Sequence, residues 1–399
     1  MKYTRVILIV LDGFGVGILP DEFNNAQNES SFEDVLDIAG MPVIPTLASF
    51  GMFNLTKKYI TRDMNYNASY GKMKLSSKFK DSWAGHWELA GCEIDYTKVD
   101  SSYWINGFPE PIIRLFEKQT GYIVLGNRAF LRREDVIPHY IDDHNKMKKS
   151  VIVLTEEGIE SVRTFGLYAL LDNVPVDILY DLCEKASELL RPYNKIIGRI
   201  GARPLRYNND RAITVPHELR KDYLIFDPPD STILKQLKLN NINSYTVGKV
   251  SAMFRGTYIK DSIQTSSNKQ SMDGISNFCT KVDHGLIWGN LNDFDAKYGH
   301  YYDYMGWKKS LENFDIELTK LISCIRNDDL LIICSDGHGC DCIYTGIHTR
   351  EFSPLIIYSK EIECAYLGED NILNDVAATI ASSFCITFDC SGKSLLTKI

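Results

Sequence analysis

Three short apolar segments, far apart in the chain, each lead into aspartates, and this repeated pattern constrains the fold most. Segments 6–11, 285–288 and 330–334 are followed by Asp12, by Asp293 and Asp295, and by Asp336. Short runs rich in Val, Ile and Leu are typical of strands buried in a parallel sheet, and open α/β sheets bind ligands at the carboxyl ends of their strands. The pattern therefore predicts a sheet with several carboxylates along its carboxyl edge. For any single aspartate, an equally good interpretation is a cap on the next helix or turn.

Segments with helical periodicity alternate with these strands. Apolar residues at i, i+3 and i+4 predict helices over 177–190 and 308–325, and Ser231 is predicted to cap a helix that runs through Leu237. This alternation predicts an α/β core in which helices flank a central, mostly parallel sheet.

The length of the chain and the placement of its polar residues predict two lobes. At 399 residues the chain exceeds the size at which a single core usually stops growing. Most of the candidate site residues fall within 12–88 and 295–348, whereas the stretch between them has strand and helix patterns of its own. We therefore predict a core formed by 1–100 and 223–399, with 101–222 inserted as a second, α+β lobe that covers the site as a cap.

Charge and composition exclude several classes of partner. A net charge of -8, from 44 basic and 52 acidic residues, argues against nucleic acid or an anionic membrane as the main partner. No segment is as long and apolar as a membrane span, which needs about 20 apolar residues. The ten cysteines show no disulfide framework, which favours reduced thiols and a cytoplasmic protein. The sequence makes no prediction about the oligomeric state.

The candidate site combines carboxylates, imidazoles and one hydroxyl group. The candidate metal ligands are Asp12, Ser82, Asp295, His300, Asp336, His338 and His348. Carboxylate oxygens mixed with imidazole nitrogens suit Mn²⁺, Zn²⁺ or Mg²⁺. Two such ions ~3.5–4 Å apart can clamp the attacking and leaving oxygens of a phosphoryl transfer, so we expect two divalent ions. A histidine taken alone is more often an ordinary core or surface residue.

Ser82 is the predicted nucleophile. It follows Asp81 and precedes a predicted helical turn through Trp87, and a helix N-terminus stabilises a phosphoryl group through free N–H groups and the helix dipole. Contact with a metal ion would lower the pKa of the hydroxyl enough for attack on phosphorus. The alternative is that Ser82 or Asp81 only caps the helix. Cys340 and Cys342 form a competing soft site for zinc, but we interpret them as neighbours of a turn rather than as ligands.

These residues resemble those of the prokaryotic-type phosphopentomutases, in the alkaline-phosphatase-like metalloenzyme superfamily. The most specific stretch is 81–88, which is similar to the family's Asp-Thr-x-x-Gly-His-Trp-Glu. Further matches are 9–12, 198–204, 248–251, 292–300 and 348–351. The resemblance implies the fold of that superfamily, two manganese ions, and exchange of the 1- and 5-phosphates of ribose or deoxyribose through a phosphorylated nucleophile, here a phosphoserine at Ser82.

The resemblance also implies how the ligands divide between the two ions, with Ser82 between them. One ion would be bound by Asp12, Asp336 and His338, and the other by Asp295, His300 and His348. Arg199 and Lys249 are candidate contacts to the phosphate or the sugar. The alternative for these two is a solvated or structurally paired basic residue.

The chain departs from the family pattern in the core and more strongly in the predicted cap. Ser82 replaces a threonine, and Asp-Gly-His at 336–338 replaces Asp-His-Gly. We align Gly337 as an insertion, because the following residues then match the family's His-Gly-Asn-Asp. Without that gap Gly337 would occupy a ligand position. In the cap, 130–133 differ from the family pattern, and the acidic sugar contact after Thr155 has no clear counterpart among Glu156, Glu157 and Glu160.

Three hypotheses follow. The leading one is a phosphomutase acting on a pentose phosphate or a related sugar phosphate. The second is a phosphatase or phosphodiesterase using the same site, with water as acceptor. A closed cap that excludes water favours the mutase, and the altered cap keeps the second hypothesis open. The third is a non-catalytic relative that binds a sugar phosphate or a partner protein, and the presence of all six Asp and His ligands argues against it.

Overall fold

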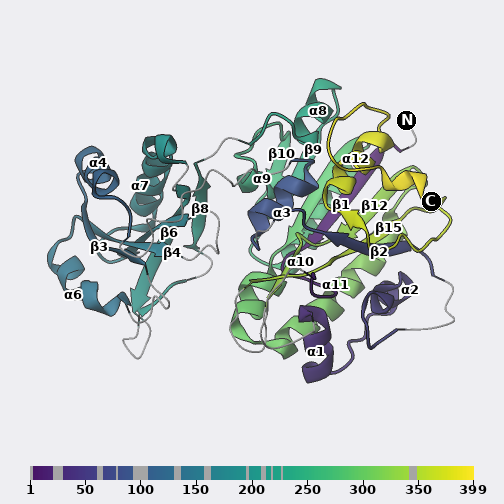
Figure 1. The fold of residues 1–399 in the computed structure, drawn as a ribbon, viewed down its shortest axis with the longest axis horizontal. Coiled ribbons are helices and arrows are strands. Elements are labelled where there is room, and N and C mark those ends of the chain that lie inside the picture. The colour runs from purple at the N-terminus through teal and green to yellow at the C-terminus, as the bar shows by residue number, and fades with distance from the viewer. Residues whose placement is uncertain are drawn as a thin grey trace. The chain divides into compact units, whose positions relative to one another are not determined.

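The chain forms two compact units in the computed structural model (Figure 1). The core unit comprises Met1–Ile94 and Pro228–Ile399, and the inserted unit comprises Asp95–Asp227. The structure describes residues 3–20, 30–60, 66–77, 80–92, 107–129, 136–156, 163–194, 197–207, 213–216, 219–225, 228–340 and 348–399.

The core unit is built on an eight-stranded sheet. Its strand order is β10 (Asp261–Ile263), β9 (Ser244–Val247), β11 (Gly285–Leu291), β1 (Arg5–Leu11), β12 (Asp329–Cys334), β15 (Ser353–Tyr358), β2 (Ser69–Lys74) and β16 (Asn371–Ile372). All pairings are parallel except the two made by β15, which is antiparallel to β12 and β2. The predicted fold class, an α/β core with a mostly parallel sheet, is confirmed.

The three strands predicted from the apolar segments lie side by side in the centre of this sheet. β1 pairs with β11 on one edge and with β12 on the other, and the register joins Leu11 to Leu291 and Val10 to Cys334. All residues of the three strands are buried, which explains why their sequences are continuously apolar rather than alternating. Their carboxyl ends therefore meet at one edge of the sheet.

Helices cover both faces of the sheet. On one face α1 (Ser31–Ala39), α2 (Pro45–Ser49), α10 (Asn268–Lys281) and α11 (Tyr304–Cys324) pack on a cluster that includes Ile7 and Ile9 of β1. On the other face Trp288 of β11 stacks on His86 and contacts Phe254. This places α3 (Ser82–Leu89) and α9 (Val250–Met253) there, and α3 also packs on α12 (Asn374–Ser383).

The predicted helix over 308–325 is present as α11, and it begins earlier because Asp303 accepts a hydrogen bond from Gly306 N at 2.8 Å. The prediction that Ser231 caps the next helix was wrong. Thr232 caps α8 (Ile233–Leu239), since its hydroxyl accepts from Lys235 N at 3.2 Å, while Ser231 Oγ lies 3.8 Å from Cys92 Sγ. An N-cap side chain accepts from the backbone N–H two or three residues later, and in α8 Thr232 makes that bond.

The inserted unit has a sheet and cores of its own. The sheet order is β3 (Ile123–Ala129), β4 (Ser150–Glu156), β5 (Arg163–Leu170), β6 (Ile197–Tyr207) and β7 (Ile213–Thr214), and β8 (Lys221–Leu224) also pairs with β6. α4 (Glu110–Thr120) and α7 (Val176–Leu189) share one apolar cluster, and α6 (Pro138–Lys146) contributes to another. The predicted helix over 177–190 is α7.

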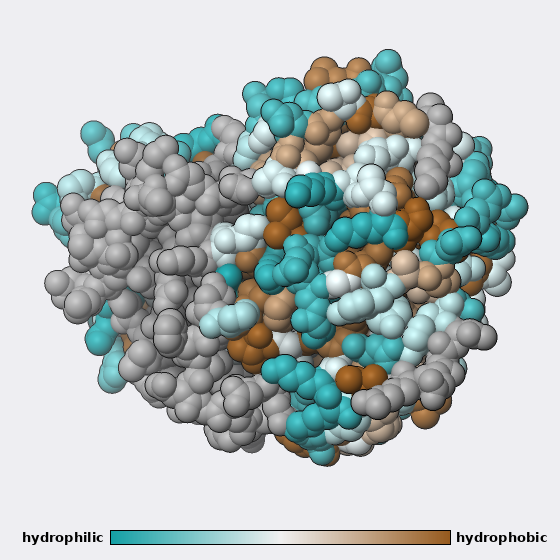
Figure 2. All heavy atoms as spheres, turned by 45° about the vertical axis from the view of Figure 1, so that its right-hand side comes forward, coloured by the Kyte–Doolittle hydropathy of each residue, from teal (hydrophilic) through white to brown (hydrophobic). Residues whose placement is uncertain are grey.

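Among the described residues, no helix combines the length and the apolar character that crossing a bilayer requires. The surface view of the core unit shows hydrophilic and hydrophobic residues interspersed (Figure 2), which is ordinary for the exterior of a folded domain.

Candidate active site

The carboxyl edge of the sheet brings two groups of potential metal ligands together. Asp12 follows β1, Asp336 follows β12, and Asp295 lies in the helical turn Phe294–Tyr298 (η5) that follows β11. The first ligand group consists of Asp12, Asp336 and His338. The second ligand group consists of Asp295, His300, Cys340 and His348. Within each group the ligand atoms lie within 4.8 Å of one another.

The first ligand group is fully buried. His338 Nε2 lies 3.2 Å from Asp336 Oδ2 and 3.6 Å from Asp12 Oδ1. His338 Nδ1 faces Gly339 O at 3.2 Å. Burial opposes the charged form of His338, but the nearby carboxylates, that of Asp336 foremost, outweigh it and raise the pKa of His338 well above its usual value. Nε2 is thus the ring atom of His338 that faces both carboxylates, where a metal ion would be bound.

Gly337 makes this geometry available. Its φ of +81° lies in the left-handed region, and a Cβ there would stand 2.8 Å from Leu75 Cβ. The chain turns at this glycine and continues into β13 (His338–Cys340), so His338 rather than Gly337 faces Asp12. The contact between His338 and Asp12 agrees with the alignment in which Gly337 is an insertion, because His338 then takes the ligand position and Gly337 does not.

Ser82 Oγ lies against the first ligand group. It donates to Asp12 Oδ1 at 2.9 Å and lies 3.1 Å from His338 Nε2. The N-cap of α3 is Asp81, which accepts from Ala84 N at 2.8 Å, so the capping alternative does not apply to Ser82. A Cβ at Gly85 would lie 1.9 Å from Asp336 O, and the missing side chain therefore lets α3 approach the loop after β12.

Lys249 also reaches this point. It precedes α9, and its Nζ lies 2.7 Å from Ser82 Oγ and forms an ion pair with Asp12 Oδ2. Burial opposes the charged form, but the carboxylates, that of Asp12 foremost, outweigh it and raise the pKa of Lys249 above its usual value. Lys249 therefore holds a positive charge beside the Ser82 hydroxyl.

The second ligand group surrounds a single carboxylate oxygen. His348 Nε2, Cys340 Sγ and His300 Nε2 lie 3.1, 3.2 and 3.3 Å from Asp295 Oδ1. His348 Nδ1 donates to Lys80 O, which leaves Nε2 for a metal ion. The rings of His338 and His348 are stacked with centroids 4.0 Å apart, so the two ligand groups adjoin each other.

The charges of the site suit cations. Burial would raise the pKa of Asp295, but His300 and His348 hold it well below its ordinary value. Burial would also raise the pKa of Asp336, but the nearby His338 outweighs this effect and lowers the pKa of the carboxyl group. Asp336 Oδ2 is buried and accepts no hydrogen bond from the described residues. Buried carboxylate and imidazole donors that converge, with one oxygen left over, fit divalent ions.

Arg199 lies in β6 of the inserted unit. Its Nε donates to Thr164 Oγ1 at 2.5 Å, and its guanidinium lies 3.6 Å from Asp222. Residues 130–133, Glu157, Glu160 and Cys342 lie outside the described residues.

Two residues of the cluster were outside the predicted set of site residues. Asn290 donates to Asp12 Oδ2 at 2.8 Å. In the sequence, the signal for this role was a polar residue within the otherwise apolar strand β11. Cys340 was interpreted as a neighbour of the turn. It follows His338 by two residues in a strand, and this spacing places both side chains on one face.

Comparisons with known proteins show the family to which the chain belongs. A family model described as the metalloenzyme superfamily matches residues 4–387. The phosphopentomutase of Caldanaerobacter subterraneus subsp. tengcongensis is 35% identical over 399 residues, covering 99% of this chain and 98% of the relative. The phosphopentomutase of Clostridioides difficile is 34% identical over 396 residues, covering 98% of each. The chain belongs to the phosphopentomutase family of the metalloenzyme superfamily.

A solved structure shows the same fold at lower similarity. The phosphoglycerate mutase of Leishmania mexicana, determined at low cobalt concentration, has a TM-score of 0.51 and 12% identity, covering 98% of this chain and 97% of that chain. The predicted resemblance to the phosphopentomutase family is confirmed, and metal binding is consistent with the two ligand groups.

Proposed function

We propose that the protein is a metal-dependent phosphopentomutase, which moves a phosphoryl group between the 1 and 5 positions of ribose or deoxyribose phosphate through a phosphoserine at Ser82. The observation that carries the proposal is the position of Ser82 Oγ, 2.9 Å from Asp12 Oδ1 and 2.7 Å from Lys249 Nζ, beside two adjoining groups of metal ligands. Similarity to curated phosphopentomutases over nearly the whole chain supports the substrate class.

The ligand groups assign residues to two ions. Asp12, Asp336, His338 and Ser82 would hold the first, and Asp295, His300 and His348 would hold the second. When bound, the ions neutralise charge on the phosphoryl oxygens and lower the pKa of the serine hydroxyl. Mn²⁺ is our proposal for the oxygen-rich first group, with Mg²⁺ or Zn²⁺ as alternatives.

Ser82 is held ready to carry the phosphoryl group. Its hydroxyl donates to Asp12 Oδ1, so that carboxylate orients the oxygen and is placed to take its proton. Ser82 is also the first residue of α3, where free N–H groups and the positive end of the helix dipole favour a bound phosphoryl group. The phosphoserine would pass its phosphoryl group to the free hydroxyl of a sugar monophosphate and recover one from the other position.

Lys249 stabilises the oxygen that bears charge during each transfer. Its ammonium contacts Ser82 Oγ directly, and a preorganised cation at a reacting oxygen lowers the barrier without reorganisation. This extends the sequence-based proposal of a phosphate contact. Arg199 and the inserted unit remain our proposal for binding the rest of the sugar phosphate.

The test is a substrate screen with the purified full chain and Mn²⁺. Ribose 1-phosphate, ribose 5-phosphate and their deoxy forms are each supplied, and both the isomer and free phosphate are measured. The mutase predicts isomer without matching phosphate release. Free phosphate as the sole product would assign a hydrolase instead, and the Ser82→Ala variant should lose either activity.

A further inference from the structure

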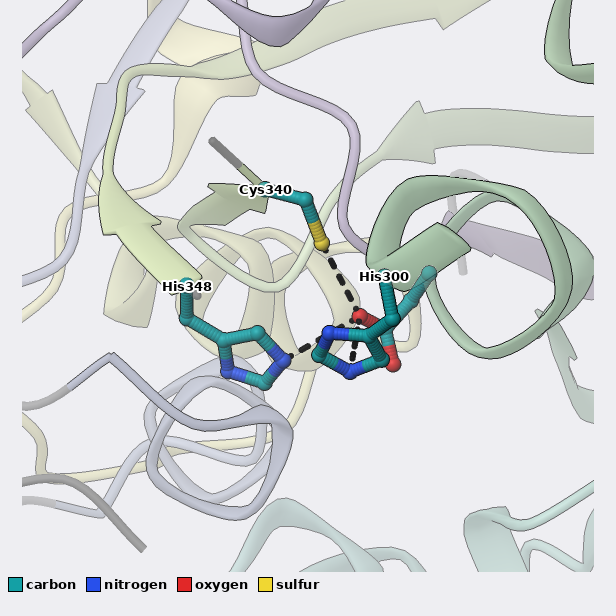
Figure 3. Close-up of side chains that lie close together, drawn as sticks. His300, Cys340 and His348 are labelled. Carbon is teal, nitrogen blue, oxygen red and sulfur yellow. Dashed lines mark hydrogen bonds and ion pairs between the residues drawn. The ribbon is translucent and has the colours of Figure 1, made fainter. Parts of the chain in front are cut away.

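The second ligand group contains a sulfur donor that the proposed mutase site does not use. Figure 3 shows the side chains of His300, Cys340 and His348 converging, and all three contact Asp295 Oδ1. The three contact distances are 3.1–3.3 Å. Ligand atoms around a tetrahedral zinc ion are about 3.3–3.8 Å apart, as follows from bond lengths of about 2.0–2.3 Å. All four donor atoms lie within 4.8 Å of one another, so the group is compact enough to surround one ion.

The backbone holds Cys340 in this place. Cys340 is the direct cross-strand partner of His348 in the antiparallel pair of β13 and β14 (His348–Arg350), so both side chains lie on one face. Its exposed fraction is 1%. A Cβ at Gly299 would stand 2.8 Å from Cys340 Sγ, and the glycine beside His300 therefore leaves room for the sulfur.

The donors of the two ligand groups differ in softness. The first offers two carboxylates and one imidazole, whereas the second offers one carboxylate, two imidazoles and one thiol. Hard oxygen donors suit Mn²⁺ and Mg²⁺, whereas a thiolate favours Zn²⁺ over both of these ions. With Cys340 as thiolate, each group supplies two negative charges to one divalent ion, but without it the second group supplies only one.

We propose that Cys340 is the fourth protein ligand of the second ion and makes this group a zinc site, while the first group holds a harder ion. On binding, the Cys340 S–H bond breaks, the sulfur keeps the electron pair and bonds to the ion, and the proton leaves to solvent. The inference rests on the proposed function only for the presence of an ion beside Asp295. The competing role for Cys340 is a neutral thiol that merely donates to Asp295 Oδ1.

Cobalt substitution tests the sulfur bond without any assay of activity. The metal-free full chain is titrated with Co²⁺ alone, and the near-ultraviolet charge-transfer band from thiolate to cobalt is recorded. The band is expected in the wild type and should be lost in Cys340→Ser. It should persist in Cys92→Ser, a buried cysteine outside the group, and in Cys342→Ser, the neighbouring cysteine.

Competition between metals tests the selectivity. Protein equilibrated with equal Zn²⁺ and Mn²⁺ should bind zinc at the second group, and zinc X-ray absorption should show a sulfur at about 2.3 Å. In Cys340→Asn we expect zinc affinity to fall at least tenfold, with the circular dichroism unchanged.

The outcomes separate the two proposals. Two bound ions without a sulfur signal, or a signal lost only in Cys342→Ser, would overturn the role of Cys340 and leave the proposed function intact. No bound ion at all would overturn both. Zinc bound equally well by the wild type and Cys340→Asn would also refute the zinc site.

Discussion

The two ligand groups lie next to each other but are built differently. All three residues of the first group are completely buried, whereas in the second the side chains of His300 and His348 are 35% and 14% exposed. The first group contacts the proposed nucleophile, Ser82 Oγ, and is surrounded by Asn290, Lys249 and Gly13 N. The second group is instead centred on Asp295 Oδ1, which its two imidazoles and its thiol all contact.

The difference in burial indicates which role each ligand group has. A buried group cannot lose a charge without leaving its partners uncompensated, so the first group is expected to be intolerant of change and to exchange its ion slowly. A partly exposed group with mixed donors can release its ion more easily. We therefore expect the first group to control the chemistry, and the second to control which metal and how much of it the protein retains.

The largest expected effect is at Asp336. Asp336→Asn removes one charge from a fully buried group in which His338 and Gly13 N contact the carboxylate. Breaking a buried charged interaction costs about 3–5 kcal/mol, or about 10²–10³-fold or more in affinity for the first ion. Metal analysis by mass spectrometry should find one ion fewer per chain. Two ions retained at wild-type affinity would contradict the assignment.

Lys249→Met should have the next largest effect. Because Lys249 Nζ contacts Ser82 Oγ, its loss should lower kcat by about 10²–10³-fold with little change in KM. Steady-state kinetics of the isomerisation measures both constants. The control is Lys235→Met, since Lys235 pairs with Asp230 on the surface. A raised KM at unchanged kcat would show that Lys249 binds substrate instead.

His300→Ala should act more weakly because this proposed ligand is the most exposed imidazole of the second group. We expect a loss of about 10–100-fold in affinity for the second ion, similar to the effect of perturbing a metal ligand's support, and a first ion that is unaffected. Titration with a chelator, followed by metal analysis, measures both. His139→Ala in α6 is the matched control. Simultaneous loss of both ions would show that the groups are not independent.

The smallest effect on activity is expected from Glu351→Gln, which tests the packing beneath both groups. Glu351 is buried, and it accepts hydrogen bonds from Ser31 N at 2.9 Å, from Ser31 Oγ at 2.8 Å and from Thr349 Oγ1. Cβ atoms at Gly15 and Gly339 would both collide with its carboxyl group. Burial raises the pKa of Glu351 to about 8.

The pH dependence follows from this shift. Between the unfolded pKa of about 4.3 and the folded value, the folded state binds the extra proton, so stability is highest at low pH and falls as pH rises. The wild type should lose up to about 5 kcal/mol of this contribution by pH 8, and Glu351→Gln should not. Urea unfolding at pH 5 and pH 8 measures the difference, with Glu361→Gln as control. Parallel pH profiles would contradict the shift.

The elements that could be predicted from the sequence are those determined by neighbouring residues in the chain. β1, β11 and β12 were predicted because a strand buried on both faces must be continuously apolar, and their terminal aspartates then had to share an edge. The cap of α8 was predicted one residue early, since Ser231 and Thr232 are both good caps and only the hydrogen bond to Lys235 N distinguishes them.

The remaining features depend on contacts between distant segments. The position of Cys340 is determined by the pairing of β13 with β14 and by the space at Gly299. Neither contact can be recognised from a single segment of the sequence. Lys249 was predicted as a candidate contact to the phosphate or the sugar, but its ion pair with Asp12 requires the turn after β9 to lie beside the end of β1. The prediction that Ser82 is the nucleophile likewise required Asp81, rather than Ser82, to be the N-cap of α3.

The central claim is that Ser82 Oγ, held between Asp12 and Lys249, carries the phosphoryl group. The most direct measurement is peptide mass spectrometry of the full chain after incubation with Mn²⁺ and ribose 1,5-bisphosphate, quenched in acid. The account predicts one phosphate on the peptide that contains Ser82 and none in Ser82→Ala. Phosphate on a different residue, or an active enzyme with no phosphorylated residue at any time point, would contradict it.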